Sequence, residues 1–383
     1  MEVKSSPGNR IVILDSVRGM AALIVVFHHL YSVYFNDFKR VFSYELNLLF
    51  GFISEMNLEA VLFFFVISGF SIKLNSNKLN LNSDEGINKY FYKRFKRILP
   101  PYYISLIIAG LIAFIFFNRY DNSLSLYNLA GNIFFLQTPG AIKGNWFLPY
   151  AYNGVLWSLS FEMFFYFLYP CCCRYIYPFF DRILNIKTGI SEISKPLFYS
   201  FIISGLGFVT NYLIPNPISS FLSMYIVWYA GVFAAEIYLS GKNYKIEFGI
   251  LFLLLSLSFL LFLVINSSIV NSWFKGFGIS IILLVLYQIR KYRFKIVQIA
   301  EKSINVIFSF YGKGSYSIYL FHYPFVLLTA YLIKTGTLQY FYQSIIFVLI
   351  LISIIPFFED FLVKRKFSFL QFNYSKFFPA VKI

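Results

Sequence analysis

The chain of 383 residues is too apolar for a soluble protein: 58% of its residues are hydrophobic, only 13% are charged, and the mean hydropathy is +0.67. A soluble protein has about a quarter of its residues charged, so most of this surface must face lipid. The net charge of +16 would suggest a nucleic-acid partner in a soluble protein, whereas in a membrane protein it follows from basic cytoplasmic loops.

Ten stretches are long enough to cross a bilayer, which takes about 20 apolar residues per helix. The first is too long for the apolar region of a signal peptide and has no small-residue cleavage site, so we expect a retained helix. The sequence predicts an all-α integral membrane protein, a single domain over 1–383 with about ten transmembrane helices. The predicted spans are 11–34, 54–74, 98–117, 154–173, 196–214, 218–239, 247–266, 273–289, 314–333 and 339–358.

The distribution of basic residues predicts the orientation of this bundle. With the N-terminus in the cytoplasm, 27 Lys and Arg fall in inner segments and 6 in outer ones. An excess of this kind marks cytoplasmic loops, so we expect both termini in the cytoplasm and no nucleic-acid partner. The three cysteines are consecutive, Cys171 to Cys173, which argues against a disulfide framework and a cysteine zinc site.

The first span carries ionisable residues where they are costly. Arg18 and His29 are eleven residues apart, which places them within roughly 20° on one helix face and roughly 16 Å apart along the axis. Asp15 lies one turn before Arg18, within reach of an ion pair. An ionisable residue inside a membrane helix indicates function, and histidine is the usual general base. The alternative is a snorkelling arginine and a histidine bonded to a neighbouring helix.

The segment before the third span alternates basic and aromatic residues and ends in a Pro-Pro pair that we expect to open the helix. It contains Arg94 and Arg97. Arginine binds phosphate through two parallel hydrogen bonds, so one interpretation is a polyphosphate site. The other is an anchor that contacts anionic lipid.

The fourth span opens with Trp157 and Ser158 and carries Glu162 one turn further on the same face as Ser158. An unpaired carboxylate in an apolar helix is very costly. We therefore expect Glu162 to face the bundle and to pair with a cation or a hydroxyl, in a structural or a catalytic role.

The ninth span holds Ser315, Tyr316 and His322. Ser315 and His322 are seven residues apart and share a face. The alternative is a kinked helix with packed tyrosines. No GxSxG elbow is found, so a serine hydrolase site is not expected, and the three histidines are too scattered to predict a metal site.

Five segments, in this order, resemble the motifs of the membrane-bound acyltransferase 3 family over nearly the full length. The first segment has a basic residue, ten intervening residues and a histidine. The second segment is a Phe-rich run that ends in Ser-Gly-Phe, and the third segment is an RxxR element followed by Leu-Pro. The segments are 14–29, 63–70, 94–97, 157–162 and 315–322.

The resemblance implies transfer of an acyl group, usually acetyl from acetyl-CoA as co-substrate, to a hydroxyl of a carbohydrate such as O-antigen, capsule or exopolysaccharide. It implies a multi-pass protein of a bacterial inner membrane that needs no metal. Because the chain ends soon after the tenth span, we expect a member without an SGNH-type domain.

The same resemblance assigns roles to the residues singled out above. Arg94, Arg97 and Arg18 are expected to bind CoA. His29 is expected to act as the base or as a transient acyl carrier, together with Arg18 and with Glu162, which could orient His29 or pair with Arg18. The residues expected to bind the acceptor are Trp157, Ser158, Ser315, Tyr316 and His322.

Two other functions remain open from the sequence. An exporter of a glycan or of its lipid-linked precursor would be favoured by inverted internal repeats, and none is seen. A scaffold protein in a polysaccharide assembly complex would tolerate substitution of His29 and Glu162.

Overall fold

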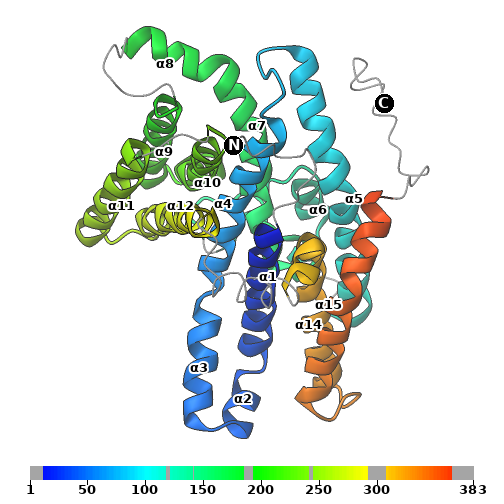
Figure 1. Cartoon of the computed structure of the whole chain (residues 1–383). Coiled ribbons are helices and arrows are strands. Elements are labelled where there is room, and N and C mark those ends of the chain that lie inside the picture. The colour runs from blue at the N-terminus through cyan, green and yellow to red at the C-terminus, as the bar shows by residue number, and fades with distance from the viewer. Residues whose placement is uncertain are drawn as a thin grey trace.

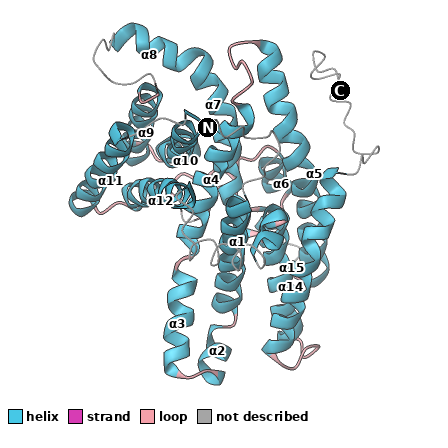
Figure 2. Ribbon diagram, in the orientation of Figure 1, coloured by secondary structure: helices cyan, strands magenta, loops and turns pink. Residues whose placement is uncertain are grey.

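The computed structural model describes residues 12–117, 121–140, 142–184, 193–240, 245–291 and 308–364. Within these ranges the protein is built from helices and short turns, and no β-strand is found (Figure 2). The basic residues at 4–10, those at 292–302 and those beyond 364 lie outside the described residues.

Ten helical segments of the described chain are long and apolar enough to cross a membrane, as the sequence predicts. The main helices of these segments are α1 Val12–Val33, α4 Asn57–Ser76, α5 Asp84–Phe116, α7 Trp157–Cys171, α9 Lys195–Leu213, α10 Pro217–Ser240, α11 Lys245–Ile265, α12 Ser268–Lys291, α14 Ser315–Lys334 and α15 Phe341–Lys364. The second segment, Tyr44–Ser76, also includes the helix before α4, and the fourth, Gly154–Leu184, continues past α7. The shorter elements are α2 Phe35–Val41, α3 Tyr44–Glu55, η1 Asn122–Leu124, α6 Leu126–Ile133, η2 Tyr150–Tyr152, η3 Gly154–Leu156, the π-turn η4 Cys172–Ile176 and α8 Tyr177–Leu184.

The helices form two groups that meet along α4. Figure 1 shows α9 to α12 gathered on one side, and α1, α14 and α15 together on the other. Helix α10 is the centre of the first group, because 89% of the residues in its apolar stretch are buried. In α11 only 11% of the corresponding residues are buried, so this helix faces outward. Helix α10 also packs extensively on α4, so it connects the two groups.

Two glycines allow α4 and α10 to cross in close contact. A Cβ on Gly69 would lie 2.1 Å from the Trp228 carbonyl oxygen, and a Cβ on Gly231 would lie 1.9 Å from that of Val66. Only glycine fits where two helix backbones approach this closely, a common way of packing membrane helices. The crossing fixes the face of α4 that carries Ser68.

Helix α5 is longer than the predicted span. It begins at Asp84 and continues through Pro100 and Pro101, so the expectation that the proline pair opens the helix is wrong. Ser83 caps the start, because its hydroxyl accepts a hydrogen bond from the Gly86 amide at 3.2 Å. Neighbouring helices allow proline inside a membrane helix. The added turns bring Arg94 and Arg97 into the bundle on a rigid helix.

Two lysines of the spanning helices are paired with glutamates. Lys275 lies in α12 and forms an ion pair with Glu59 of α4. Lys73, at the end of α4, pairs with Glu236 of α10 at 2.7 Å. Both pairs join α4 to the α9–α12 group, which offsets the cost of charge in this part of the chain.

The segment between α5 and α7 folds back on the bundle and holds the start of α7. The Tyr102 hydroxyl donates to the Asn132 carbonyl oxygen at 2.7 Å. The Gln137 amide donates to the Leu156 carbonyl oxygen at 2.8 Å, next to Trp157. These bonds fix the position at which Trp157 and Ser158 enter α7.

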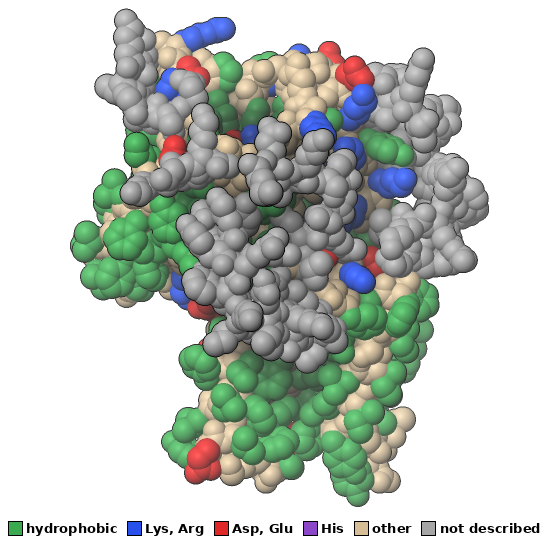
Figure 3. Space-filling model, in the orientation of Figure 1, with side chains coloured by type: hydrophobic (Ala, Val, Ile, Leu, Met, Phe, Trp, Pro, Cys, Tyr) green, Lys and Arg blue, Asp and Glu red, His purple; other side chains and the backbone are tan. Residues whose placement is uncertain are grey.

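The exposed surface separates by residue type. In Figure 3 the lower half of the visible face is mainly hydrophobic, and the Lys and Arg side chains lie in the upper half. The beginning of α1 and the end of α15 lie toward the same side in Figure 1. This is the arrangement expected for an even number of spans.

Candidate active site

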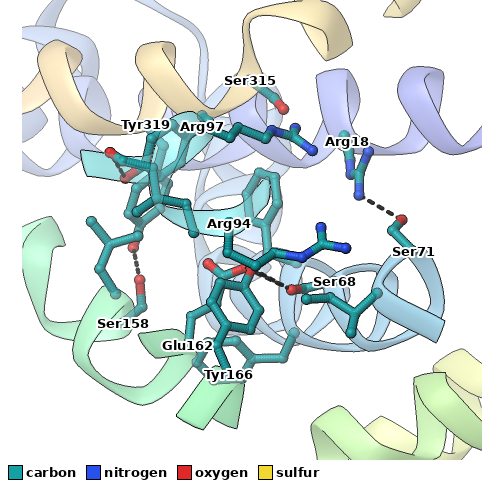
Figure 4. A pocket seen from close by; sticks show the side chains of 16 residues that line it. Arg18, Ser68, Ser71, Arg94, Arg97, Ser158, Glu162, Tyr166, Ser315 and Tyr319 are labelled. Carbon is teal, nitrogen blue, oxygen red and sulfur yellow. Dashed lines mark hydrogen bonds between the residues drawn. The ribbon is translucent and has the colours of Figure 1, made fainter. Parts of the chain in front are cut away.

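One cavity lies where α1, α4, α5, α7 and α14 meet, and it encloses about 770 Å³ including its open mouth. Its polar lining comes from all five helices. Figure 4 shows the guanidinium groups of three arginines gathered on one side of it. The lining residues used below are Arg18, Ser68, Ser71, Arg94, Arg97, Ser158, Glu162, Tyr166, Ser315, Tyr316 and Tyr319.

Arg18 is held toward the cavity from α1. Its Nη2 donates to Ser71 Oγ of α4 at 2.7 Å, and its Nη1 lies 3.8 Å from an oxygen of Asp15. The predicted ion pair one turn apart is therefore present. The contact with Ser71 fixes one edge of the guanidinium plane and orients it at the cavity wall (Figure 4).

Arg94 is the most buried of the three arginines, at 8% exposed, whereas Arg97 is exposed at the mouth. The Arg94 guanidinium lies 5.7 Å from the centre of the Tyr90 ring. Its buried Nε has no hydrogen-bond partner among the described residues. An unsatisfied donor on a buried cation is costly, so the position favours an anionic ligand.

Glu162 accepts two hydrogen bonds at the base of the cavity. Ser68 Oγ donates to Glu162 Oε1 at 2.6 Å, and the Tyr166 hydroxyl donates to the same oxygen. The Trp228 indole N–H donates to Ser68 Oγ at 3.3 Å. Glu162 is thus bonded to hydroxyl groups, which are one of the two kinds of partner predicted for it. Its hydrogen bonds do not involve His29 or Arg18.

The α14 side of the cavity is formed by hydroxyl groups. The Ser158 and Tyr319 hydroxyls lie 2.8 Å apart. The Tyr316 hydroxyl donates to the Ile98 carbonyl oxygen of α5 at 3.1 Å, and Ser315 Oγ donates to the Gly312 carbonyl oxygen at 3.0 Å. The Ser158–Tyr319 and Tyr316–Ile98 contacts hold α14 against α7 and α5 on this side of the cavity, whereas the Ser315 bond is local to the start of α14.

His29 and His322 do not line the arginine cavity but meet each other at a second place. Their ring centres lie 5.3 Å apart, and the His29 ring also lies 4.4 Å from that of Tyr323. Tyr319 connects the two places, because it lines the cavity and its ring centre lies 6.1 Å from that of His322. The arginines and the histidines therefore form two linked sites.

The structure brings together most of the residues that the sequence singles out. Seven share the cavity, namely Arg18, Arg94, Arg97, Ser158, Glu162, Ser315 and Tyr316. His29 and His322 pair elsewhere. Trp157 is outside the cavity lining and packs edge-on against Phe161 at 5.5 Å.

Other cavity residues were not predicted. Ser68 lies in the segment 63–70, which the sequence singles out only as a family-like motif, and the close approach of α10 at its neighbour Gly69 is seen only in the structure. Tyr166 follows Glu162 by four residues, which places both on one helix face. Glu359 does not line the cavity, but its Oε2 accepts from the Ser317 amide of α14 at 3.2 Å, and it lies one residue past the predicted tenth span.

Comparison with known proteins gives a family match over most of the chain. Residues 11–358 match a family model described as an acyltransferase domain. A protein of Acidianus two-tailed virus named "Putative acetyltransferase" is 33% identical over 104 residues, which cover 27% of this chain and 28% of that protein. No solved structure matches.

Longer matches come from Staphylococcus aureus. In strains COL and Mu50, proteins named "Putative O-acetyltransferase" are 26% identical over 340 residues, which cover 82% of this chain and 50% of each relative. The chain thus spans half or less of the length of these relatives.

Proposed function

The chain belongs to the acyltransferase 3 family, and from this premise we propose that it transfers an acyl group, in the first place acetyl, from acyl-CoA to a hydroxyl of a glycan. The setting we propose is a bacterial inner membrane, with the arginine cavity open to the cytoplasm. The observation that carries the proposal is the convergence of Arg18, Arg94 and Arg97 on one cavity.

The cavity suits the phosphates of coenzyme A. Guanidinium groups bind phosphate oxygens through paired hydrogen bonds, and the buried Nε of Arg94 lacks a protein partner among the described residues. Glu162 is the main opposing charge in the lining, and its Oε1 is occupied by Ser68 and Tyr166. The cavity is therefore electropositive where an anion would bind.

The distance of His29 from the arginines supports a role of His29 in the transfer step. It lies roughly 16 Å along α1 from Arg18, because eleven residues separate them at 1.5 Å each. The donor is extended, with its phosphates at one end and its thioester at the other, so the reacting group would lie away from the arginines. We propose that His29 takes the proton of the acceptor hydroxyl there.

The donor site is tested by initial rates against acetyl-CoA concentration in membrane vesicles. Arg94→Gln is expected to raise the KM for acetyl-CoA about tenfold or more, because a hydrogen bond to a charged group contributes about 1.5–3 kcal/mol and about 1.4 kcal/mol is a factor of ten. The matched control is Lys93→Gln, which removes an exposed charge outside the cavity. An unchanged KM in Arg94→Gln would support the lipid-anchor interpretation.

The reaction is tested by mass spectrometry of surface and lipid-linked glycans from cells with the wild-type gene, a deletion or His29→Ala. The proposal predicts a mass increment of one acetyl group only with the wild type. Loss of the whole glycan on deletion, restored by His29→Ala, would instead support an exporter or a scaffold.

A further inference from the structure

His322 is a buried imidazole whose tautomer is set by its own helix. Its side chain is 0% exposed, and its Nδ1 lies 2.9 Å from the Ile318 carbonyl oxygen, one turn earlier in α14. A carbonyl oxygen cannot donate, so Nδ1 carries the proton. In the neutral ring the lone pair is then on Nε2.

The Nε2 atom of His322 has no hydrogen-bond partner among the described residues. Leaving a buried acceptor unsatisfied is costly, so such an atom in a native fold calls for an explanation. A functional donor that reaches Nε2 during the reaction would provide one.

His29 is the donor within reach. The ring centres of His29 and His322 are 5.3 Å apart, with their planes inclined by 33°. A hydrogen bond of about 3 Å between two imidazole nitrogens corresponds to ring centres about 5 Å apart, since each nitrogen lies about 1 Å from its ring centre. A rotation of the His29 ring, without movement of either helix, can therefore bring its N–H to Nε2.

His28 does not fill this role, although its ring centre is 5.0 Å from that of His29. Its Nδ1 is already 2.9 Å from the Ser54 carbonyl oxygen and 3.0 Å from Ser54 Oγ. His28 is thus bonded to α3 through Nδ1, and because Nδ1 donates to the Ser54 carbonyl, its Nε2 is an acceptor and cannot donate to His322, so His28 serves as a control.

We propose that His322 is the positioning residue of the transfer step: its Nε2 accepts the N–H of His29 and thereby aims the other His29 nitrogen at the acceptor hydroxyl. This inference rests on the proposed function. The hydroxyl O–H bond breaks and its proton goes to the free His29 nitrogen, while the oxygen forms a C–O bond to the acyl carbon. The C–S bond breaks, and the CoA thiolate takes that proton from His29.

The test compares the activities of two variants of His322. A packing role predicts that the apolar variant is the more active one, whereas a positioning role predicts the opposite order. His322→Leu fills the site with apolar atoms and removes the acceptor, whereas His322→Gln keeps an acceptor oxygen. We expect kcat to fall about tenfold to a hundredfold in His322→Leu with little change in the KM for acetyl-CoA, and to recover in part in His322→Gln. His28→Gln is the control and should stay within about twofold of the wild type.

Coupling to His29 provides the second readout, and it is measured on protein that elutes as a single species in detergent. In a His29→Ala background, the residual turnover measured in vitro at high enzyme concentration should not fall further in His322→Leu, because the two residues act as one unit. Equal or higher activity of His322→Leu than of His322→Gln, or additive losses in the double variant, would overturn the inference. Full activity of His29→Ala alone would instead overturn the proposed role of His29.

Discussion

At the residue scale, separate sets of hydrogen bonds fix two of the charged groups that line the cavity, Arg18 and Glu162. Arg18 is held by Ser71, and Glu162 is held by Ser68 and Tyr166. Ser68 also accepts from Trp228, so this hydroxyl joins α4, α7 and α10. A polar network in an apolar surrounding is stabilising only when its members are satisfied.

Ser68→Ala should therefore destabilise the protein. It removes the hydroxyl that donates to Glu162 at 2.6 Å, and a hydrogen bond to a charged group contributes about 1.5–3 kcal/mol. The measurement is the thermal unfolding midpoint in detergent. Ser256→Ala is the control, because among the described residues that hydroxyl bonds only the Phe252 carbonyl oxygen of its own helix, at 2.9 Å. Equal midpoints for the two variants would contradict the network role of Ser68.

The residues of the site could be predicted where chemistry alone made them costly. Arg18, Glu162 and His29 are ionisable groups in apolar helices, so their positions in the sequence were enough to single them out as candidate site residues. The sequence could not pair His29 with His322, since the two are far apart in the chain and meet only through the packing of α1 on α14. It also could not predict the hydrogen bond between Ser68 and Glu162, because that contact depends on how α4 and α7 are rotated about their own axes.

At the element scale, hydropathy predicted the spans but not how far their helices extend. Helix α5 begins well before the apolar stretch because Ser83 caps it and Asp84 and Glu85 lie in its first turn. Helix α3 precedes α4 with a break only at Met56. A window of apolar residues reports the part of a helix inside hydrocarbon, whereas caps and tertiary contacts decide where the helix ends.

The crossing of α4 and α10 makes a specific prediction. Gly231→Ala should reduce the yield of folded protein and destabilise it by about 1–3 kcal/mol, the usual cost of overpacking, because the new Cβ meets the Val66 backbone. Folded yield is read by size-exclusion chromatography. In Gly249→Ala, nothing lies within 4 Å of the added Cβ, and helix propensity favours alanine. A normal yield of Gly231→Ala would show that the helices can separate without cost.

At the scale of the whole molecule, the charge distribution predicts how the bundle sits in the bilayer. The segment between α4 and α5 should face the cytoplasm and the segment between α5 and α7 the opposite side. Lys78 and Lys143 are exposed representatives of the two segments. Both can be replaced without touching the cavity lining.

A membrane-impermeant maleimide tests this orientation. In intact cells, Lys143→Cys should react above the background of the native cysteines, and Lys78→Cys should react only after permeabilisation. The unmodified chain gives the background. The reverse labelling pattern would place the arginine cavity on the side away from cytoplasmic acyl-CoA and would contradict the proposed donor route.

The cluster of Arg18, Arg94 and Arg97 has one further consequence, for ion leakage. A polar route that lets an acyl group reach the middle of a bilayer could also conduct protons and metal ions and so dissipate the membrane potential. Fixed arginines at a constriction repel cations, as in pores that exclude protons. If the cluster binds a polyanionic donor as proposed, the same guanidinium groups would also repel cations that enter the cavity, so the donor site itself would oppose ion leakage between reaction cycles.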